Sequence, residues 1–146
     1  MSDAFRDAEV LCLDLEGTLV SNAISCFPRP GLKEFAETCR ASFARVVMYS
    51  TVRSELVRDI LKLLEDEGNL PAGFAAAVEI VRAEGGKKDL RLIVDDPATA
   101  VLIDDSDVAV PGQEDRVVRI AEFQPPFDQD DDALVAMAET IRRLRA

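Results

Sequence analysis

Acidic and hydroxyl side chains follow three short apolar runs of this chain, in positions that could assemble a reactive site. The runs are residues 10–13, 46–49 and 101–103, and the polar residues after them are Asp14 and Glu16, Ser50 and Thr51, and Asp104 and Asp105. Near-continuous apolar runs of this length are typical of strands buried on both faces of a parallel sheet. In open α/β sheets, ligands bind beyond the carboxyl ends of such strands. The pattern therefore predicts one site at that edge of the sheet.

The residue types at this edge suit the transfer of a phosphoryl group. A carboxylate at Asp14 is ionised at neutral pH and can attack phosphorus without a base to activate it. Glu16 can protonate the leaving oxygen and later activate a water molecule. Asp104 and Asp105 offer the hard oxygen ligands that Mg²⁺ prefers.

Neighbouring residues compete for two further roles. Either Ser50 or Thr51 can hydrogen-bond a phosphoryl oxygen while the other caps the following helix, and we favour Ser50. Either Lys87 or Lys88 can neutralise the phosphate and reduce its repulsion from the acidic site. Arg29 is equally consistent with a structural anchor and with a substrate contact.

The composition of the 146-residue chain excludes some chemistry. With 17 basic and 28 acidic residues, the net charge is -11, which disfavours nucleic acid as a partner. The chain has no histidine, so histidine bases and imidazole metal sites are excluded. Its three cysteines fit neither a disulfide framework nor a common zinc spacing. No apolar stretch approaches the ~20 residues that span a bilayer, and no secretory signal is visible. We expect a cytoplasmic protein with no membrane partner.

Strand and helix patterns alternate along the chain. Strands are predicted at 10–13, 45–49, 100–103 and 117–120, and helices at 32–43, 54–67 and 131–145, with a helical turn opening at 87–90. Ser54 is the expected N-cap of the second helix, and Gly68 with Asn69 its stop. Residues 74–81 suit either a helix or a strand. This alternation indicates one parallel α/β domain spanning 1–146.

The motifs, taken in order, resemble those of the haloacid dehalogenase superfamily. They are the stretch 14–19 (Asp-Leu-Glu-Gly-Thr-Leu), a strand that ends on Ser50, a lysine before a strand, and that strand ending in Asp104-Asp105. Segments 29–35, 88–90 and 103–106 are similar to the NLI-interacting-factor-like, or CTD-phosphatase-like, branch. The resemblance covers residue 9 to the C-terminus. It favours Lys88 over Lys87, because Lys88 begins the Lys-Asp-Leu pattern.

The resemblance implies a role for each motif residue. Asp14 would be the nucleophile that becomes an aspartyl-phosphate, and Glu16 the general acid and base, with its backbone carbonyl on Mg²⁺. Ser50 (or Thr51) and Lys88 would hold the phosphoryl group. The implied metal site consists of Asp14, Glu16, Asp104 and Asp105.

The resemblance also implies a three-layer α/β/α sandwich around a mainly parallel sheet, with no large cap domain. The stretch between the first two motifs is short, and no large insertion follows the lysine. An uncapped, open site of this kind often serves a phosphorylated macromolecule, such as a phosphoprotein.

Glu16 departs from most phosphatases of the superfamily, which have a second aspartate at its position. One extra methylene moves the carboxyl group by about a C–C bond, and a misplacement of ~1 Å can cost about 100-fold in rate. Enolase-phosphatases of the same superfamily nevertheless resemble Asp-x-Glu-Gly-Thr. Two alternatives therefore stay open: a phosphate-recognising binding module without full catalysis, and a small-molecule phosphatase or phosphotransferase.

Overall fold

The apolar runs form the centre of a five-stranded parallel sheet. The computed structural model describes residues 3–145. Its strands are β1 (Val10–Leu13), β2 (Arg45–Ser50), β3 (Glu79–Arg82), β4 (Ala100–Asp104) and β5 (Val117–Arg119). Their order across the sheet is β3-β2-β1-β4-β5, and all four neighbouring pairs are parallel. The predicted α/β fold with a parallel sheet is confirmed.

The register of the central strands aligns the polar residues that follow them. Leu13 of β1 pairs with Met48 of β2 on one side and with Ile103 of β4 on the other. The next residue, Asp14, donates its backbone N–H to the Ile103 carbonyl oxygen at 3.1 Å. Asp14 and Asp104 therefore leave neighbouring strands at the same level.

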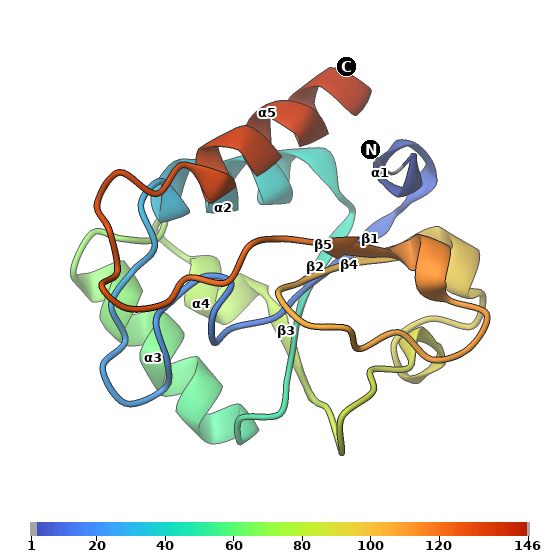
Figure 1. Ribbon diagram of the computed structural model, residues 1–146, viewed down its shortest axis with the longest axis horizontal. Helices are drawn as coiled ribbons and strands as arrows, with labels where there is room; N and C mark the ends of the chain where they lie inside the picture. Colours follow the sequence, from blue (N-terminus) through green and yellow to red (C-terminus); the bar gives the residue numbers. More distant parts are fainter. Residues whose placement is uncertain (1–2, 146) are drawn as a thin grey trace.

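Long helices cover one face of the sheet. They are α2 (Leu32–Ser42), α3 (Ser54–Asp66) and α5 (Ala133–Leu144), with the one-turn helices α1 (Ala4–Asp7) and α4 (Phe74–Ala77) beside them. Their apolar side chains form one continuous core with Leu11, Met48 and Ile103 of the sheet. Figure 1 shows α2 and α5 side by side, and α3 with α4 towards the β2–β3 half of the sheet.

A layer with little regular structure covers the opposite face. This layer consists of the segments before and after β4, residues 83–99 and 105–116, and contains three short 3₁₀ helices: η1 (Leu90–Leu92), η2 (Pro97–Thr99) and η3 (Glu114–Arg116). Leu90 and Val108 from this layer pack against Cys12, Tyr49 and Leu102 of the sheet. Residues 3–145 include no separate cap domain, so no further domain covers the carboxyl edge of the sheet.

The structure also decides local details that the sequence prediction gave wrongly or left open. Ser54 is the first residue of α3 rather than its N-cap, and the N-cap position belongs to Arg53, so that prediction was wrong. The ambiguous stretch 74–81 is both a helix and a strand: α4 ends at Ala77 and β3 begins at Glu79. Gly68 ends α3 as expected, with a φ of 82° that glycine adopts without strain.

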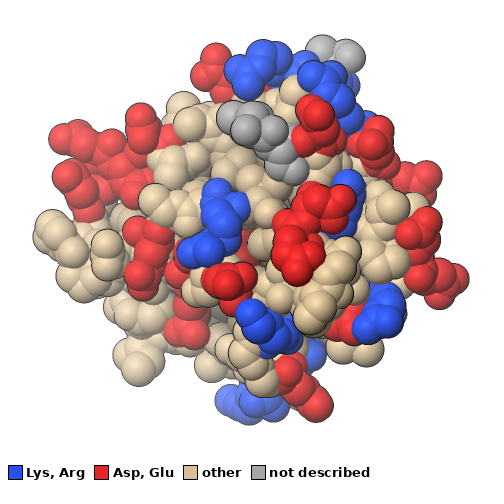
Figure 2. Space-filling model, turned by 45° about the vertical axis from the view of Figure 1, so that its right-hand side comes forward, with Lys and Arg blue, Asp and Glu red and all other residues tan. Residues whose placement is uncertain are grey.

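Figure 2 shows how charged side chains are distributed over one face of the molecule. Acidic side chains gather in several places, basic side chains lie between them, and no extended basic area is visible on this face. Within the described chain, no helix combines the length and apolar character needed to cross a membrane.

Candidate active site

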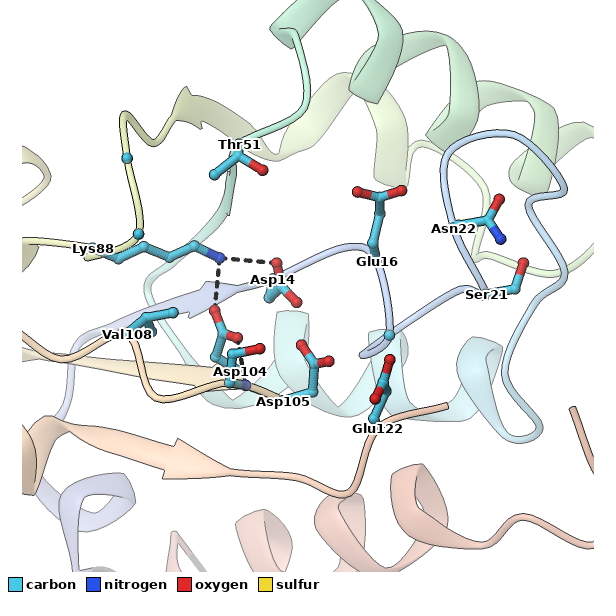
Figure 3. Close-up of a pocket in the computed structure, with 14 residues that line it drawn as sticks. Asp14, Glu16, Ser21, Asn22, Thr51, Lys88, Asp104, Asp105, Val108 and Glu122 are labelled. Atoms are coloured by element: carbon cyan, nitrogen blue, oxygen red, sulfur yellow. Dashed lines mark hydrogen bonds and ion pairs between the residues drawn. The ribbon is translucent and has the colours of Figure 1, made fainter. Parts of the chain in front are cut away.

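Three carboxylates converge at the carboxyl edge of the sheet (Figure 3). Asp14 follows β1, Asp104 ends β4, and Asp105 comes next in the chain. One oxygen of each lies within 4.8 Å of the others. Asp14 and Asp104 are buried, whereas Asp105 is half-buried. This donor set, made only of hard oxygens, suits a divalent cation such as Mg²⁺.

Lys88 reaches into this cluster from the layer on the opposite face. Its ammonium nitrogen lies 2.9 Å from Asp14 Oδ1 and 2.6 Å from Asp104 Oδ2. The Lys88 backbone N–H donates to the Val108 carbonyl oxygen at 2.8 Å, which fixes the start of the side chain. The neighbouring Lys87 is exposed, and its ammonium group donates instead to the Asp107 carbonyl oxygen. Of the two lysines, the structure brings Lys88 into the cluster.

The ionisation of these groups reflects burial and mutual attraction. Burial raises the pKa of Asp14 to about 6, and the attraction of Lys88 only partly offsets it. Burial also raises the pKa of Asp104. For Lys88, burial opposes the charge, but Asp14 and Asp104 outweigh it and raise the pKa. Lys88 is therefore positively charged at neutral pH, and the two carboxylates beside it ionise less readily than they would in water.

Thr18 connects the carboxylates that follow β1 and β4. Its fully buried hydroxyl lies 2.9 Å from Asp14 Oδ2 and 3.3 Å from Asp105 Oδ1. No role was predicted for Thr18 from the sequence. One sequence signal could have indicated it: Thr18 is a hydroxyl residue four positions after Asp14, in the turn that follows a buried strand.

Gly17 lets this turn pass close to Asp105. Its φ is 77°, a left-handed conformation that side chains rarely adopt. A Cβ atom at this position would lie 2.4 Å from Asp105 Oδ2. An alanine here would strain the backbone, and its Cβ would displace the Asp105 carboxyl group.

Glu16 is held by the loop that follows it. Its Oε2 accepts the Ala23 backbone N–H at 2.7 Å, while its carboxyl group faces the cavity beside Ser21 and Asn22. Among the described residues this is the only hydrogen bond of the Glu16 carboxyl group. Oε1 therefore accepts no hydrogen bond from the residues that the structure describes.

An open cavity of about 540 Å³ contains these groups. It is lined by Asp14, Glu16, Gly17, Ser21, Asn22, Thr51, Gly85, Gly86, Lys88, Asp104, Asp105, Ser106, Val108 and Glu122. Six of the seven site residues predicted from the sequence are in this set. The exception is Ser50, which is buried and whose hydroxyl accepts the Val52 backbone N–H at 3.1 Å. Thr51 is the hydroxyl residue on the cavity wall.

Arg29 anchors the turn from behind. Its fully buried guanidinium donates to both carboxylate oxygens of Asp131, at 2.9 and 3.1 Å. It also donates to the carbonyl oxygens of Thr18 at 3.2 Å and Ala121 at 2.6 Å. Of the two readings left open, the structure supports the structural anchor.

One family of known proteins matches almost the whole chain. The sequence pattern of the NLI interacting factor-like phosphatases matches residues 9–146. The chain belongs to the NLI interacting factor-like phosphatase family. The resemblance found in the sequence is confirmed, and the chain is a phosphatase. No curated protein sequence matches the chain.

A solved structure shares the fold of this NLI interacting factor-like phosphatase. It is a Vibrio cholerae protein whose name gives it as a 3-deoxy-D-manno-octulosonate 8-phosphate phosphatase. The TM-score is 0.60 at 12% identity, over 98% of this chain and 88% of that chain. At this identity the likeness concerns the fold alone.

Proposed function

We propose that the chain hydrolyses phosphomonoesters with Mg²⁺ through an aspartyl-phosphate on Asp14. The observation that carries this proposal is the position of the buried Asp14 carboxylate. It lies between the Lys88 ammonium group and the Thr18 hydroxyl, at the wall of an open cavity that also contains Asp104 and Asp105.

Lys88 supports the binding of a phosphoryl group. Its ammonium group has three N–H donors, and two of them point to Asp14 and Asp104. The third donor is available for a phosphoryl oxygen, and Thr51 offers a hydroxyl on the cavity wall. These donors would hold the phosphorus in front of Asp14 and stabilise the charge on the transferring group.

The three converging carboxylates fit a magnesium ion. Asp14, Asp104 and Asp105 would hold Mg²⁺, together with oxygens of the substrate. Bound there, the ion would withdraw negative charge from the phosphoryl oxygens. Lys88 reduces the repulsion among the carboxylates, and Thr18 fixes the orientation of Asp14 relative to Asp105.

Proton transfer falls to Glu16. An oxygen of the Asp14 carboxylate attacks phosphorus, the bond to the alcohol oxygen breaks, and Glu16 Oε1 gives its proton to that oxygen. Glu16 then takes a proton from water, which attacks the phosphorus of the aspartyl-phosphate and releases inorganic phosphate and free Asp14. The hydrogen bond from Ala23 fixes the direction in which the longer Glu16 side chain points.

The open cavity favours a phosphate on a macromolecule, such as a phosphorylated Ser or Thr of a protein. Nothing among residues 3–145 closes over the carboxyl edge of the sheet, so a phosphate carried by a folded or extended chain can reach Asp14.

Release of inorganic phosphate tests the proposal. We expect p-nitrophenyl phosphate and a phosphoserine peptide to be hydrolysed with Mg²⁺, and EDTA to abolish turnover. Asp14→Asn should lower kcat by about 1000-fold or more. Asp107→Asn, a change of the same kind at an exposed position outside the cavity, should have little effect. Unchanged turnover in Asp14→Asn would overturn the proposal, and phosphorylation of Asp14 without turnover would indicate a binding module.

A further inference from the structure

A fifth carboxylate, which the proposed reaction does not use, faces the cavity. Glu122 lies three residues beyond β5 and lines the cavity together with Glu16 and Asp105. Its own side chain is exposed, so it can meet a bound substrate.

The backbone on both sides of Glu122 is fixed to the catalytic turn. The Phe123 N–H donates to the Gly17 carbonyl oxygen at 2.8 Å, and the Ala121 carbonyl oxygen accepts from Arg29 at 2.6 Å. A Cβ atom built on Gly17 would lie 3.3 Å from Glu122 Cγ. Glu122 is thus held against the turn that carries Asp14 and Glu16.

The charges on the cavity wall are strongly unequal. Five carboxylates line it, from Asp14, Glu16, Asp104, Asp105 and Glu122, against the single ammonium group of Lys88. Two arginines lie near its rim, where Arg82 donates to the Thr51 carbonyl oxygen and Arg119 to that of Asp105, but neither lines the cavity. One Mg²⁺ ion neutralises only part of this excess, and a phosphate dianion adds to it.

Lys88 and the two glutamates of the cavity wall lie on different sides of Asp14, whereas Asp104 pairs with Lys88. In Figure 3, Lys88 lies on one side, and Glu16 and Glu122 lie on the other. Lys88 serves the phosphoryl group, whereas Glu16 gives its proton to the leaving oxygen. The alcohol part of the substrate therefore lies on the side of Asp14 where Glu16 and Glu122 are found.

We propose that Glu122 determines specificity by favouring phosphomonoesters whose alcohol part carries positive charge, such as a phosphorylated residue flanked by Lys or Arg. This inference rests on the proposed function, because it needs Glu16 to mark the side of the leaving group. An acidic alcohol part would lie beside the carboxylates of Glu16 and Glu122, which have no cation next to them on the cavity wall, and would be repelled by them. Because Glu122 is exposed, the attraction acts through water and is screened by salt.

The preference of the protein for one substrate over another tests the inference. We would measure, with the same protein preparation, the ratio of kcat/KM for two phosphoserine peptides of equal length, one with basic and one with acidic flanking residues. A second arm compares phosphoethanolamine with ethyl phosphate, which separates a small cationic substrate from a basic peptide.

We expect the wild-type protein to prefer the cationic member of at least one pair. At low salt, Glu122→Gln should reduce this preference by about three- to tenfold, and Glu122→Lys should reverse it. Added NaCl should weaken the wild-type preference.

Glu139→Gln on α5 is the matched control, because it removes the same charge from an exposed position outside the cavity. It should keep the wild-type preference. If the wild-type protein and Glu122→Gln hydrolyse p-nitrophenyl phosphate and show the same selectivity, the inference about Glu122 is wrong while the proposed function stands. If the wild-type protein hydrolyses no phosphomonoester with Mg²⁺, the proposed function itself fails.

Discussion

The Lys88 ammonium group lies 2.9 Å from the Asp14 carboxylate, and both side chains are buried. The same ammonium group lies 2.6 Å from Asp104, so one cation serves two carboxylates that β1 and β4 place side by side. Buried charges are tolerated when they are paired, and both carboxylates share this one cation, whereas Lys88 keeps Asp104 as a partner when Asp14 is neutral. Substitutions within it should therefore change stability as well as activity.

Asp14→Asn should stabilise the metal-free protein at neutral pH. In the folded chain the pKa of Asp14 is raised from 3.8 to about 6, so the folded state binds more protons than the unfolded state between these values. Wild-type stability therefore falls as the pH rises through this window, and Asn removes that loss. We expect Asp14→Asn to exceed the wild type by about 1–3 kcal/mol in free energy of unfolding at pH 7.5. Urea unfolding with EDTA at pH 7.5 and pH 4 measures it, and a difference that does not shrink at pH 4 would refute this explanation.

Lys88→Met should have the opposite effect. It leaves Asp14 and Asp104 buried without their cation, and the loss of one partner from a buried ion pair costs about 3–5 kcal/mol. Phosphatase activity should be lost as well. Lys87→Met is the control, because Lys87 is exposed, and it should unfold at nearly the wild-type urea concentration. Equal stability of the two variants would mean that Lys88 does not hold the site together.

Gly17→Ala should damage both the fold and the site. The left-handed φ of 77° costs an alanine about 1–2 kcal/mol, and its Cβ would also meet Asp105 Oδ2. Gly112→Ala carries the first cost alone, because Gly112 has a φ of 92° and open space around it. We expect Gly17→Ala to lose more free energy of unfolding than Gly112→Ala. We expect a clear loss of kcat in Gly17→Ala and none in Gly112→Ala. Matching kcat values in the two variants would show that the contact with Asp105 is unimportant.

Magnesium should stabilise the folded protein through the carboxylate cluster. A ligand that binds only the folded state increases its free energy of unfolding by about 2.7 kcal/mol at 100 times its Kd, and Tm rises as a result. Asp105→Asn removes one carboxylate of the cluster and should reduce the Mg²⁺-dependent rise in Tm. Asp107→Asn, two residues further on and outside the cluster, should keep it. A full Mg²⁺ effect in Asp105→Asn would place the ion elsewhere.

The strand ends could be predicted from the sequence because they depend on local patterns. Buried parallel strands are continuous apolar runs, so the residues at which they stop, Asp14 and Asp104, were visible directly. The fold then needs only neighbouring strands in register to bring these residues together. Lys88 was found through the motif order rather than through periodicity.

The remaining features depend on contacts that no local pattern encodes. Thr18 reaches both Asp14 and Asp105 only because Gly17 turns the chain sharply. Glu122 enters the cavity because Arg29 and Gly17 hold the backbone around it, a contact between distant parts of the chain. The choice between the neighbouring hydroxyls at 50 and 51 depends on the direction in which each leaves the end of β2, which apolar patterning does not specify.

The covalent state of Asp14 during turnover tests the central proposal most directly. Protein mixed with a phosphomonoester and Mg²⁺, then quenched rapidly in acid and digested, should yield the peptide containing Asp14 with one added phosphoryl group. Borohydride should reduce that acyl phosphate and convert Asp14 to homoserine, and Asp14→Asn should show neither change. Rapid phosphate release with an unmodified Asp14 peptide at every time point, or with the phosphoryl group on another residue, would contradict it.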